Sequence, residues 1–328
     1  MHLLADAGSL TAHKYGTGIV THEILKTWIN HGDTIVGYAH EHQDDLPAIF
    51  WKQTSGILWK PSLMIEGLIG HYDGFLALNH YIPPFAPGKI IALSHGLSFM
   101  RYPRLYPEAY SMLRSQMQRI AQDAHVIMTS SAKVKREWKK YTGRREGILS
   151  VPFGIPTDLK SIHAQKNAHP VPYLLYVGMD HPIKRISRIV KAFAQVYRSN
   201  SNCHLILAGV SRDRWRHPGV VVIPYADRKR LVQLYKGAHA LVSMSAYESG
   251  NLPVIESLSL GCPVIATSTA IIPELRGYVT IVDSSHMVDH LRVCLAAPRD
   301  TVSLRLRREL AAVCSWETMV SQIRNTMI

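Results

Sequence analysis

Short apolar runs alternate with amphipathic stretches along the whole chain, and this alternation most constrains the fold. Residues 3–5, 90–93 and 173–177 have the composition of buried strands, and the segments between such runs repeat apolar residues at helical spacing. The pattern is typical of strand–helix–strand units wound into parallel sheets. At about 150 residues per domain, 328 residues predict two domains.

A polar segment separates the two predicted domains. Residues 160–172 are mostly polar and rich in His, Lys and Ala, and a new apolar strand follows them. We therefore predict domains at 1–160 and 170–313. Because ligands of parallel α/β sheets bind at the carboxyl ends of strands, the cleft between the two domains is the expected site.

Composition limits the partners and the compartment. The net charge of +13 favours phosphate-bearing partners. The four cysteines, at 203, 262, 294 and 314, form no C-x-x-C pair, so we expect free thiols in a reducing cytosol. Neither a signal peptide nor a membrane span is evident, which predicts a cytoplasmic protein.

Residues 245–265 carry the densest functional signal. An apolar strand ends near Met244, a loop of small residues follows, and Pro253 stands where the first turn of a helix tolerates proline. The exposed N–H groups of such a helix attract anions, and Gly250 permits close approach of a ligand. Glu248 and Glu256 flank this point and can accept hydrogen bonds from hydroxyls. The segment predicts a polyhydroxylated, phosphate-bearing ligand.

Glu248 and Glu256, followed by Gly261-Cys262-Pro263, resemble the E-x7-E region of family 4 retaining glycosyltransferases. Further segments resemble the same family in the same order: the loop that ends in Gly16-Thr17-Gly18, Ser94-His95-Gly96, residues 151–156 of an apolar strand from Leu149 broken by Gly and Pro, residues 173–178 with Pro182 and Lys184, and Ser315-Trp316-Glu317. The resemblance implies the GT-B fold, two Rossmann-like α/β domains facing each other across a cleft. It also implies that a last helix, about 314–328, packs back on the first domain.

The resemblance also implies roles for individual residues. Lys184 would lie against the donor pyrophosphate, Glu248 would contact the sugar hydroxyls, and His95 would orient the transferred sugar. Glu256 would hold the ribose. The remaining donor-binding positions are Gly16, Gly18, Gly178, Arg185, Tyr225, Ser249, Gly250, Asn251 and Leu252.

The activity implied is transfer, with retention, of a hexosyl or deoxyhexosyl group. It would pass from a nucleotide diphosphate sugar to a hydroxyl of a glycan or lipid-linked acceptor in surface polysaccharide biosynthesis. No protein nucleophile, metal or cofactor is then required. Two departures stand out: Met179 and Asp180 follow Gly178 where the family often has an arginine, and Asn251 replaces a loop glycine.

The most basic stretch allows three interpretations. Its cationic residues include Lys133, Lys135, Arg136, Lys139 and Lys140. They form either a solvated helix face or a surface for anionic lipid, which would place the protein on the inner face of the membrane. Nucleic-acid binding is the competing class, but no recognised DNA- or RNA-binding signature accompanies these residues, so we expect no nucleic acid.

The same fold is compatible with several enzyme classes. A non-catalytic GT-B protein would share it, and so would a nucleotide-sugar epimerase or a phosphorylase. No pyridoxal-phosphate lysine motif supports a phosphorylase, and the region from Glu248 to Pro263 does not resemble the epimerase pattern. A Rossmann dehydrogenase is disfavoured because Gly16-Thr17-Gly18 does not complete G-x-G-x-x-G. The acidic and histidine residues at 40–45 lack a third ligand at a fixed spacing, and we interpret them as a solvated loop rather than a metal site.

Overall fold

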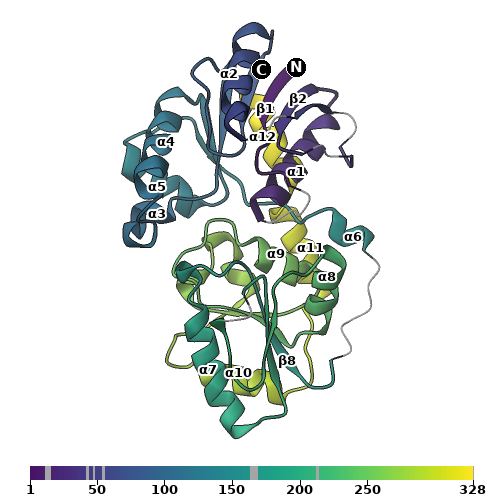
Figure 1. Cartoon of the computed structure of the whole chain (residues 1–328). Helices are drawn as coiled ribbons and strands as arrows, with labels where there is room; N and C mark the ends of the chain where they lie inside the picture. The colour runs from purple at the N-terminus through teal and green to yellow at the C-terminus, as the bar shows by residue number, and fades with distance from the viewer. Residues whose placement is uncertain are drawn as a thin grey trace. The chain divides into compact units, whose positions relative to one another are not determined.

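The chain folds into two compact units (Figure 1). The computed structural model describes residues 1–11, 16–41, 44–46, 49–53, 56–162, 169–211 and 214–327, without the side chains of Ile57 and Lys160. Unit 1 comprises Met1–Gly154 with Ser315–Ile328, and unit 2 comprises Ile155–Cys314. Residues 163–168 of the polar segment at 160–172 lie outside the described residues.

Unit 1 is built on a parallel sheet of seven strands in the order β3-β2-β1-β4-β5-β6-β7. The strands are β1 (His2–Asp6), β2 (Thr34–Ala39), β3 (Ile49–Gln53), β4 (Gly74–Ala77), β5 (Lys89–Ser94), β6 (Val126–Thr129) and β7 (Ile148–Ser150). The helices are α1 (Gly16–Ile29), α2 (Trp59–Ile69), α3 (Ser98–Arg101), α4 (Tyr110–Asp123), α5 (Ala132–Thr142) and α12 (Trp316–Met327). Central strands such as β4 are buried throughout, as expected of a sheet covered on both faces.

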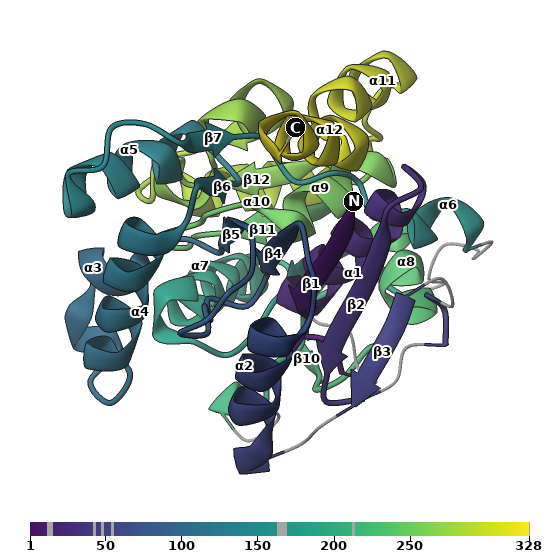
Figure 2. The same ribbon diagram turned by 90° about the horizontal axis from the view of Figure 1, so that it is seen from above.

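Helices α2, α4 and α5 pack on one face of this sheet, and α1 with α12 pack on the other (Figure 2). The basic helix α5 begins where the Ser131 side chain accepts a hydrogen bond from the Val134 N–H, and it ends at Gly143 in the left-handed conformation. The C-terminal helix α12 is held by an ion pair between Arg324 and the buried Asp33, with Nε 2.8 Å from Oδ2.

Unit 2 has a parallel sheet of six strands in the order β10-β9-β8-β11-β12-β13. The strands are β8 (Tyr173–Val177), β9 (His204–Ala208), β10 (Val220–Ile223), β11 (Ala240–Ser243), β12 (Val264–Ala266) and β13 (Thr280–Ile281). The helices are α6 (Asp158–Ser161), α7 (Ile186–Ser199), α8 (Arg228–Gly237), α9 (Leu252–Ser259), α10 (Met287–Ala296) and α11 (Leu304–Val313). Helices α7 and α10 bury apolar side chains such as Phe193 and Leu291 in one core with the strands.

Each sheet has a point where the strand order reverses direction. In unit 1 this switch point lies between β1 and β4, and in unit 2 it lies between β8 and β11. Ligands of open α/β sheets bind outside the carboxyl ends of the strands at such a point. The topology therefore predicts one ligand-binding position in each unit, at its switch point.

Two local predictions were wrong. Gly16 and Gly18 were expected in a loop, but α1 begins at Gly16, so both lie in its first turns. The apolar segment from Leu149 to Pro156 was expected to form a strand broken by Gly and Pro, but β7 ends at Ser150. Prolines at 152 and 156 remove two N–H donors that a strand would need.

Candidate functional site

A small pocket lies at the switch point of unit 2. Its walls come from the ends of β8 and β11 and from the loop before α9. The lining residues are Tyr176, Val177, Lys184, Leu241, Val242, Ser243, Ser245, Glu248, Asn251, Pro253 and Val254. Ser245 is buried, and its hydroxyl has no hydrogen-bond partner among the described residues. A polar ligand in this pocket would satisfy it.

Lys184 and Glu248 form an ion pair at this pocket. Nζ of Lys184 lies 2.8 Å from Oε1 of Glu248, and the two side chains are 23% and 12% exposed. Lys184 ends a short 3-10 helix, Pro182–Lys184, in which the His181 side chain accepts a hydrogen bond from the Ile183 N–H. Arg185 follows in the left-handed conformation, with φ of 52°, and directly precedes α7. Lys184 is thus carried on a tightly specified turn.

Helix α9 begins beside the ion pair. Asn251 precedes it in the left-handed conformation, with φ of 54°. The Asn251 amide donates to the carbonyl oxygen of Ala270 at 2.8 Å and accepts from the Ile272 N–H at 2.7 Å. Because its side chain is engaged in this way, Asn251 does not cap the first turn of α9. Asn251 therefore fixes the start of α9 next to the loop that lines the pocket. The N–H groups in the first turn of α9 can bind an anion.

Glu256 lies one turn further along α9 and is almost completely buried. Its Oε1 lies 2.6 Å from Nη1 of Arg228, and its Oε2 accepts from the Tyr235 hydroxyl at 3.0 Å. Arg228 also pairs with Asp158 of α6, Nε to Oδ2 at 2.6 Å. Burial, followed by the Glu256 carboxylate, raises the pKa of the Tyr235 phenol. Glu256, the residue predicted to hold the ribose, therefore belongs to a network with Arg228, Tyr235 and Asp158. Sequence reasoning did not identify these three residues.

The segment after β8 contains a required glycine and a hydrogen-bonded aspartate. Gly178 has φ of 153°, and a Cβ there would lie 2.9 Å from the Tyr176 hydroxyl, so the position requires glycine. Met179, which stands where the family often has arginine, is 64% exposed. Asp180 accepts from the indole N–H of Trp215 at 3.0 Å, which makes it part of the unit 2 framework.

The other predicted donor-binding residues of unit 2 follow the same loops. Gly250 and Leu252 are buried, Ser249 is half-buried, and the Tyr225 side chain is 49% exposed after the end of β10. Ser249 and Gly250 thus lie between Glu248 and the start of α9. Tyr225 lies on a different loop and does not line the pocket.

The predicted sugar-orienting residue, His95, lies in unit 1 directly after β5. Its Nε2 lies 2.8 Å from the carbonyl oxygen of Leu78, so that nitrogen carries a proton and donates. Burial lowers the pKa of His95, which favours the neutral ring with Nδ1 as an acceptor. His80 packs edge-on against it, with ring centroids 5.0 Å apart.

Gly16 and Gly18 differ in their surroundings. A Cβ on Gly18 would lie 2.9 Å from the carbonyl oxygen of Ser9, whereas a Cβ on Gly16 would meet nothing within 4 Å. Gly18 is therefore required for the close packing of α1 against the segment after β1. Gly16 leaves open space at the start of the helix.

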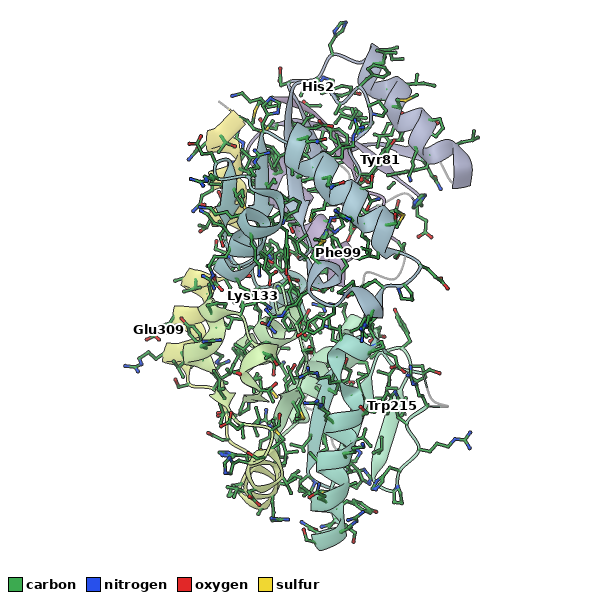
Figure 3. All side chains as sticks on the ribbon, turned by 90° about the vertical axis from the view of Figure 1, so that its left-hand side faces the viewer. His2, Tyr81, Phe99, Lys133, Trp215 and Glu309 are labelled. Carbon is green, nitrogen blue, oxygen red and sulfur yellow. The ribbon has the colours of Figure 1, made fainter. Side chains whose placement is uncertain are left out.

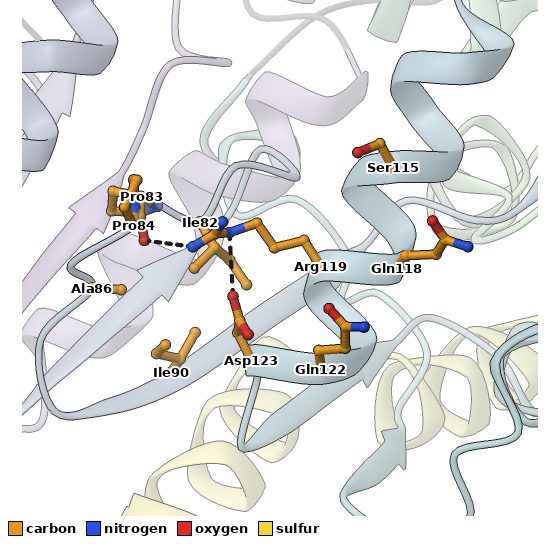
Figure 4. Close-up of a pocket in the computed structure, with 10 residues that line it drawn as sticks. All are labelled: Ile82, Pro83, Pro84, Ala86, Ile90, Ser115, Gln118, Arg119, Gln122 and Asp123. Atoms are coloured by element: carbon orange, nitrogen blue, oxygen red, sulfur yellow. Dashed lines mark hydrogen bonds and ion pairs between the residues drawn. The ribbon is translucent and has the colours of Figure 1, made fainter.

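Unit 1 also has an open hollow between the loop after β4 and helix α4 (Figure 4). Arg119 bridges it by pairing with Asp123 at 3.2 Å and donating to the carbonyl oxygen of Pro83. No sequence motif marks this hollow. Throughout the described ranges, no group of three or more His, Cys, Asp or Glu side chains is arranged to hold a metal ion; His42 of the segment at 40–45 lies outside them.

Comparisons with known proteins show what this arrangement is similar to. Residues 160–277 match the family "Glycosyl transferases group 1". The matched segment lies within unit 2. The chain is 26% identical over 174 residues to the O-antigen chain mannosyltransferase B of Escherichia coli, a match covering 47% of this chain and 45% of that protein. The chain spans about half the length of the curated relatives it matches.

Solved structures show the same fold over the whole chain. Sucrose-phosphate synthase from Thermosynechococcus elongatus superposes with a TM-score of 0.77 at 18% identity, covering 99% of this chain and 97% of that one. Anabaena Alr3699/HepE in complex with UDP-glucose superposes with a TM-score of 0.73 at 14% identity, covering 100% and 99%. The GT-B fold expected from the sequence is therefore confirmed.

Proposed function

We propose that this GT-B protein is a retaining glycosyltransferase that uses a nucleotide diphosphate sugar. The observation that carries the proposal is the Lys184–Glu248 ion pair beside the start of α9, at the switch point of unit 2. One cation, one carboxylate and a helix N-terminus provide complementary partners for phosphate and sugar hydroxyls. Anabaena HepE, which has the same fold, was solved with UDP-glucose.

The donor would bind in exchange for the ion pair. Its diphosphate would attract the Lys184 ammonium away from Glu248, and the freed carboxylate would accept hydrogen bonds from the sugar. Arg185 and the backbone N–H groups of Ser249 and Gly250 would add to the anion site. Glu256 would contact the ribose from within its network with Arg228.

Transfer would proceed on the face from which the leaving group departs. The acceptor oxygen would bond to the anomeric carbon as the bond from that carbon to the phosphate oxygen breaks. The leaving diphosphate would take the electron pair, and one of its oxygens would take the acceptor proton. Lys184 would stabilise the departing charge. His95, with Nδ1 as an acceptor, would orient the sugar. No metal enters this scheme.

The relatives and the basic helix α5 suggest an acceptor at a membrane. One relative is an O-antigen chain mannosyltransferase, so we propose a glycan or lipid-linked acceptor in surface polysaccharide biosynthesis. Arg136, Lys139 and Lys140 of α5 are exposed, and Lys133, labelled in Figure 3, and Lys135 are half-buried. We propose that they hold the protein on the inner face of the membrane. Among the described helices, none is both long and apolar enough to cross a membrane.

The reaction can be tested without knowing the acceptor, by letting water take the place of the acceptor hydroxyl. The protein is incubated with UDP-, GDP- and dTDP-sugars, and proton NMR identifies the first anomer released. We expect the protein to cleave one of these donors. If that donor is α-linked, the α-anomer of the sugar should be released first. Release of the β-anomer first from an α-linked donor would contradict retention, and cleavage of no donor by the protein would contradict the activity.

A further inference from the structure

Arg228 connects three helices of unit 2, α6, α8 and α9, which are labelled in Figure 1. Its guanidinium contacts Asp158 of α6 through two nitrogens, with Nε 2.6 Å from Oδ2 and Nη2 2.9 Å from Oδ1. The third nitrogen, Nη1, lies 2.6 Å from Oε1 of Glu256 on α9. A planar guanidinium that is held at two nitrogens has a fixed orientation. Asp158 therefore fixes the direction in which Arg228 presents Nη1 to Glu256.

The Glu256 carboxylate is held from a second side by Tyr235. The phenol donates to Oε2 at 3.0 Å, and both residues are buried. Replacing a buried ion pair by apolar side chains of similar volume is often neutral or stabilising, so stability alone does not account for such a network. A carboxylate that is held at both oxygens is suited to binding a ligand in one orientation.

Arg228 and Glu256 have hydrogen-bonding capacity beyond these contacts. A guanidinium has more N–H donors than the three that Arg228 uses here, and the others have no partner among the described residues. A carboxylate oxygen can accept more than one hydrogen bond, whereas each oxygen of Glu256 accepts one from a described side chain. Unused donors and unused acceptors thus lie side by side. A hydroxyl group, which both donates and accepts, complements this pair.

The pair lies next to the pocket at the switch point of unit 2. Pro253 lines this pocket and precedes Glu256 by three positions on α9, so the two side chains lie on one face of the helix. Arg228 is the first residue of α8, which follows the loop after β10. The side chains of Arg228 and Asp158 are 21% and 39% exposed, whereas that of Glu256 is 4% exposed. The network is therefore open to a ligand on the side of Arg228.

We propose that Arg228 binds the ribose of the donor and that Asp158 is its positioning residue. The 2′-hydroxyl of the nucleoside donates to Glu256 and accepts from Arg228. The pair therefore selects ribonucleotide donors over 2′-deoxyribonucleotide donors, because a deoxy donor leaves both groups without this hydrogen bond. The inference rests on the proposed function, in which Glu256 contacts the ribose, and it adds which class of nucleotide the donor carries.

Calorimetric titration of the full chain with UDP, 2′-deoxy-UDP, GDP, 2′-deoxy-GDP and dTDP tests this selection. Each ribonucleotide differs from its deoxy form by one hydroxyl, so the ratio of the two affinities reports the contribution of that hydroxyl. We expect the original protein to bind one ribonucleotide at least about tenfold more tightly than its deoxy form. Equal affinities for the two forms, or tighter binding of dTDP than of both ribonucleotides, would overturn the proposal.

Two variants test the residues themselves. Arg228→Lys keeps the positive charge but removes the planar fork, and it should lower the ratio to below about threefold by weakening the ribonucleotide. Asp158→Asn leaves Arg228 in place without its charged partner and should also lower the ratio. The matched control is Arg230→Lys, the same change two positions later on α8, where the side chain bonds to Gln233. The control should keep the original ratio.

The ratio separates positioning from stability, because a general loss of stability weakens both nucleotides together. An unchanged ratio in folded Arg228→Lys would overturn the role of Arg228. If that variant does not fold, Asp158→Asn carries the test, since it changes a half-buried residue, and an unchanged ratio there would overturn the proposal. Nucleotide binding with no preference for ribose would leave the proposed transferase standing. If the original protein binds none of the five nucleotides, both proposals fail.

Discussion

Nζ of Lys184 and Oε1 of Glu248 lie 2.8 Å apart although the residues are 64 positions apart in the chain. The pair joins the turn before α7 to the loop before α9, and it places a cation and a carboxylate together at the switch point of unit 2. Each residue neutralises the other. A diphosphate that binds here must compete with Glu248 for the ammonium.

Glu248→Gln should separate donor binding from transfer. Removing the carboxylate frees Lys184, so affinity for a nucleoside diphosphate should stay equal or rise. Transfer should fall about 100-fold or more, because a charged contact to the reacting sugar is lost. Calorimetry measures the first effect, and donor turnover measures the second. A variant that turns over its donor at the original rate would remove Glu248 from the reaction.

Arg228→Met should destabilise unit 2. It leaves the Glu256 carboxylate, only 4% exposed, without its cation, and breaking a buried pair in this way costs about 3–5 kcal/mol. Urea unfolding followed by circular dichroism gives the change in free energy. The control is Arg292→Met, whose exposed pair with Asp289 should contribute less than about 1 kcal/mol. Equal losses in the two variants would show that the buried network is not stabilising.

His80→Asn should change the acid dependence of stability. Burial, with His95 nearby, lowers the pKa of His80 to about 3, whereas an unfolded histidine titrates near 6.5. Between these values the unfolded chain binds more protons, so the free energy of unfolding falls as the pH drops below about 6.5. Asparagine tolerates the left-handed backbone found at this position, with φ of 64°. The variant should lose less stability from about pH 7 to about pH 5. Identical losses in urea unfolding would contradict this assignment.

Replacing Arg136, Lys139 and Lys140 by Gln should weaken binding to anionic vesicles. At about 1 kcal/mol per cation, the loss is roughly 100-fold, and sedimentation with phosphatidylserine vesicles measures it. The control removes three exposed arginines of unit 2: Arg292, Arg305 and Arg308. Equal binding of the original protein to neutral vesicles would argue against an electrostatic membrane surface.

The central strands and the helices next to them were predictable because the apolar residues within each element form the pattern of a buried strand or of an amphipathic helix. The basic helix from Ser131 has a cap, an amphipathic pattern and a terminal glycine, and it forms as expected. Edge strand β3 and helix α2 were missed. Phe50 of β3 and Ile65, Leu68 and Ile69 of α2 are exposed, so burial does not impose a periodic pattern there.

The candidate site was predictable only where a motif marks it. Lys184 and Glu248 belong to recognisable segments, and the structure brings them together. Arg228 has no motif, because its role comes from tertiary contacts with Glu256 and Asp158.

The most direct test of the account is calorimetric titration of the original protein and of Lys184→Met with UDP, GDP, dTDP and CMP, with and without a divalent cation. We predict that one nucleotide binds the original protein without added metal. Lys184→Met should bind that nucleotide at least about tenfold more weakly while unfolding at the same temperature. Equal binding by both proteins, or no binding of any nucleotide by the original protein, would contradict a donor site at Lys184.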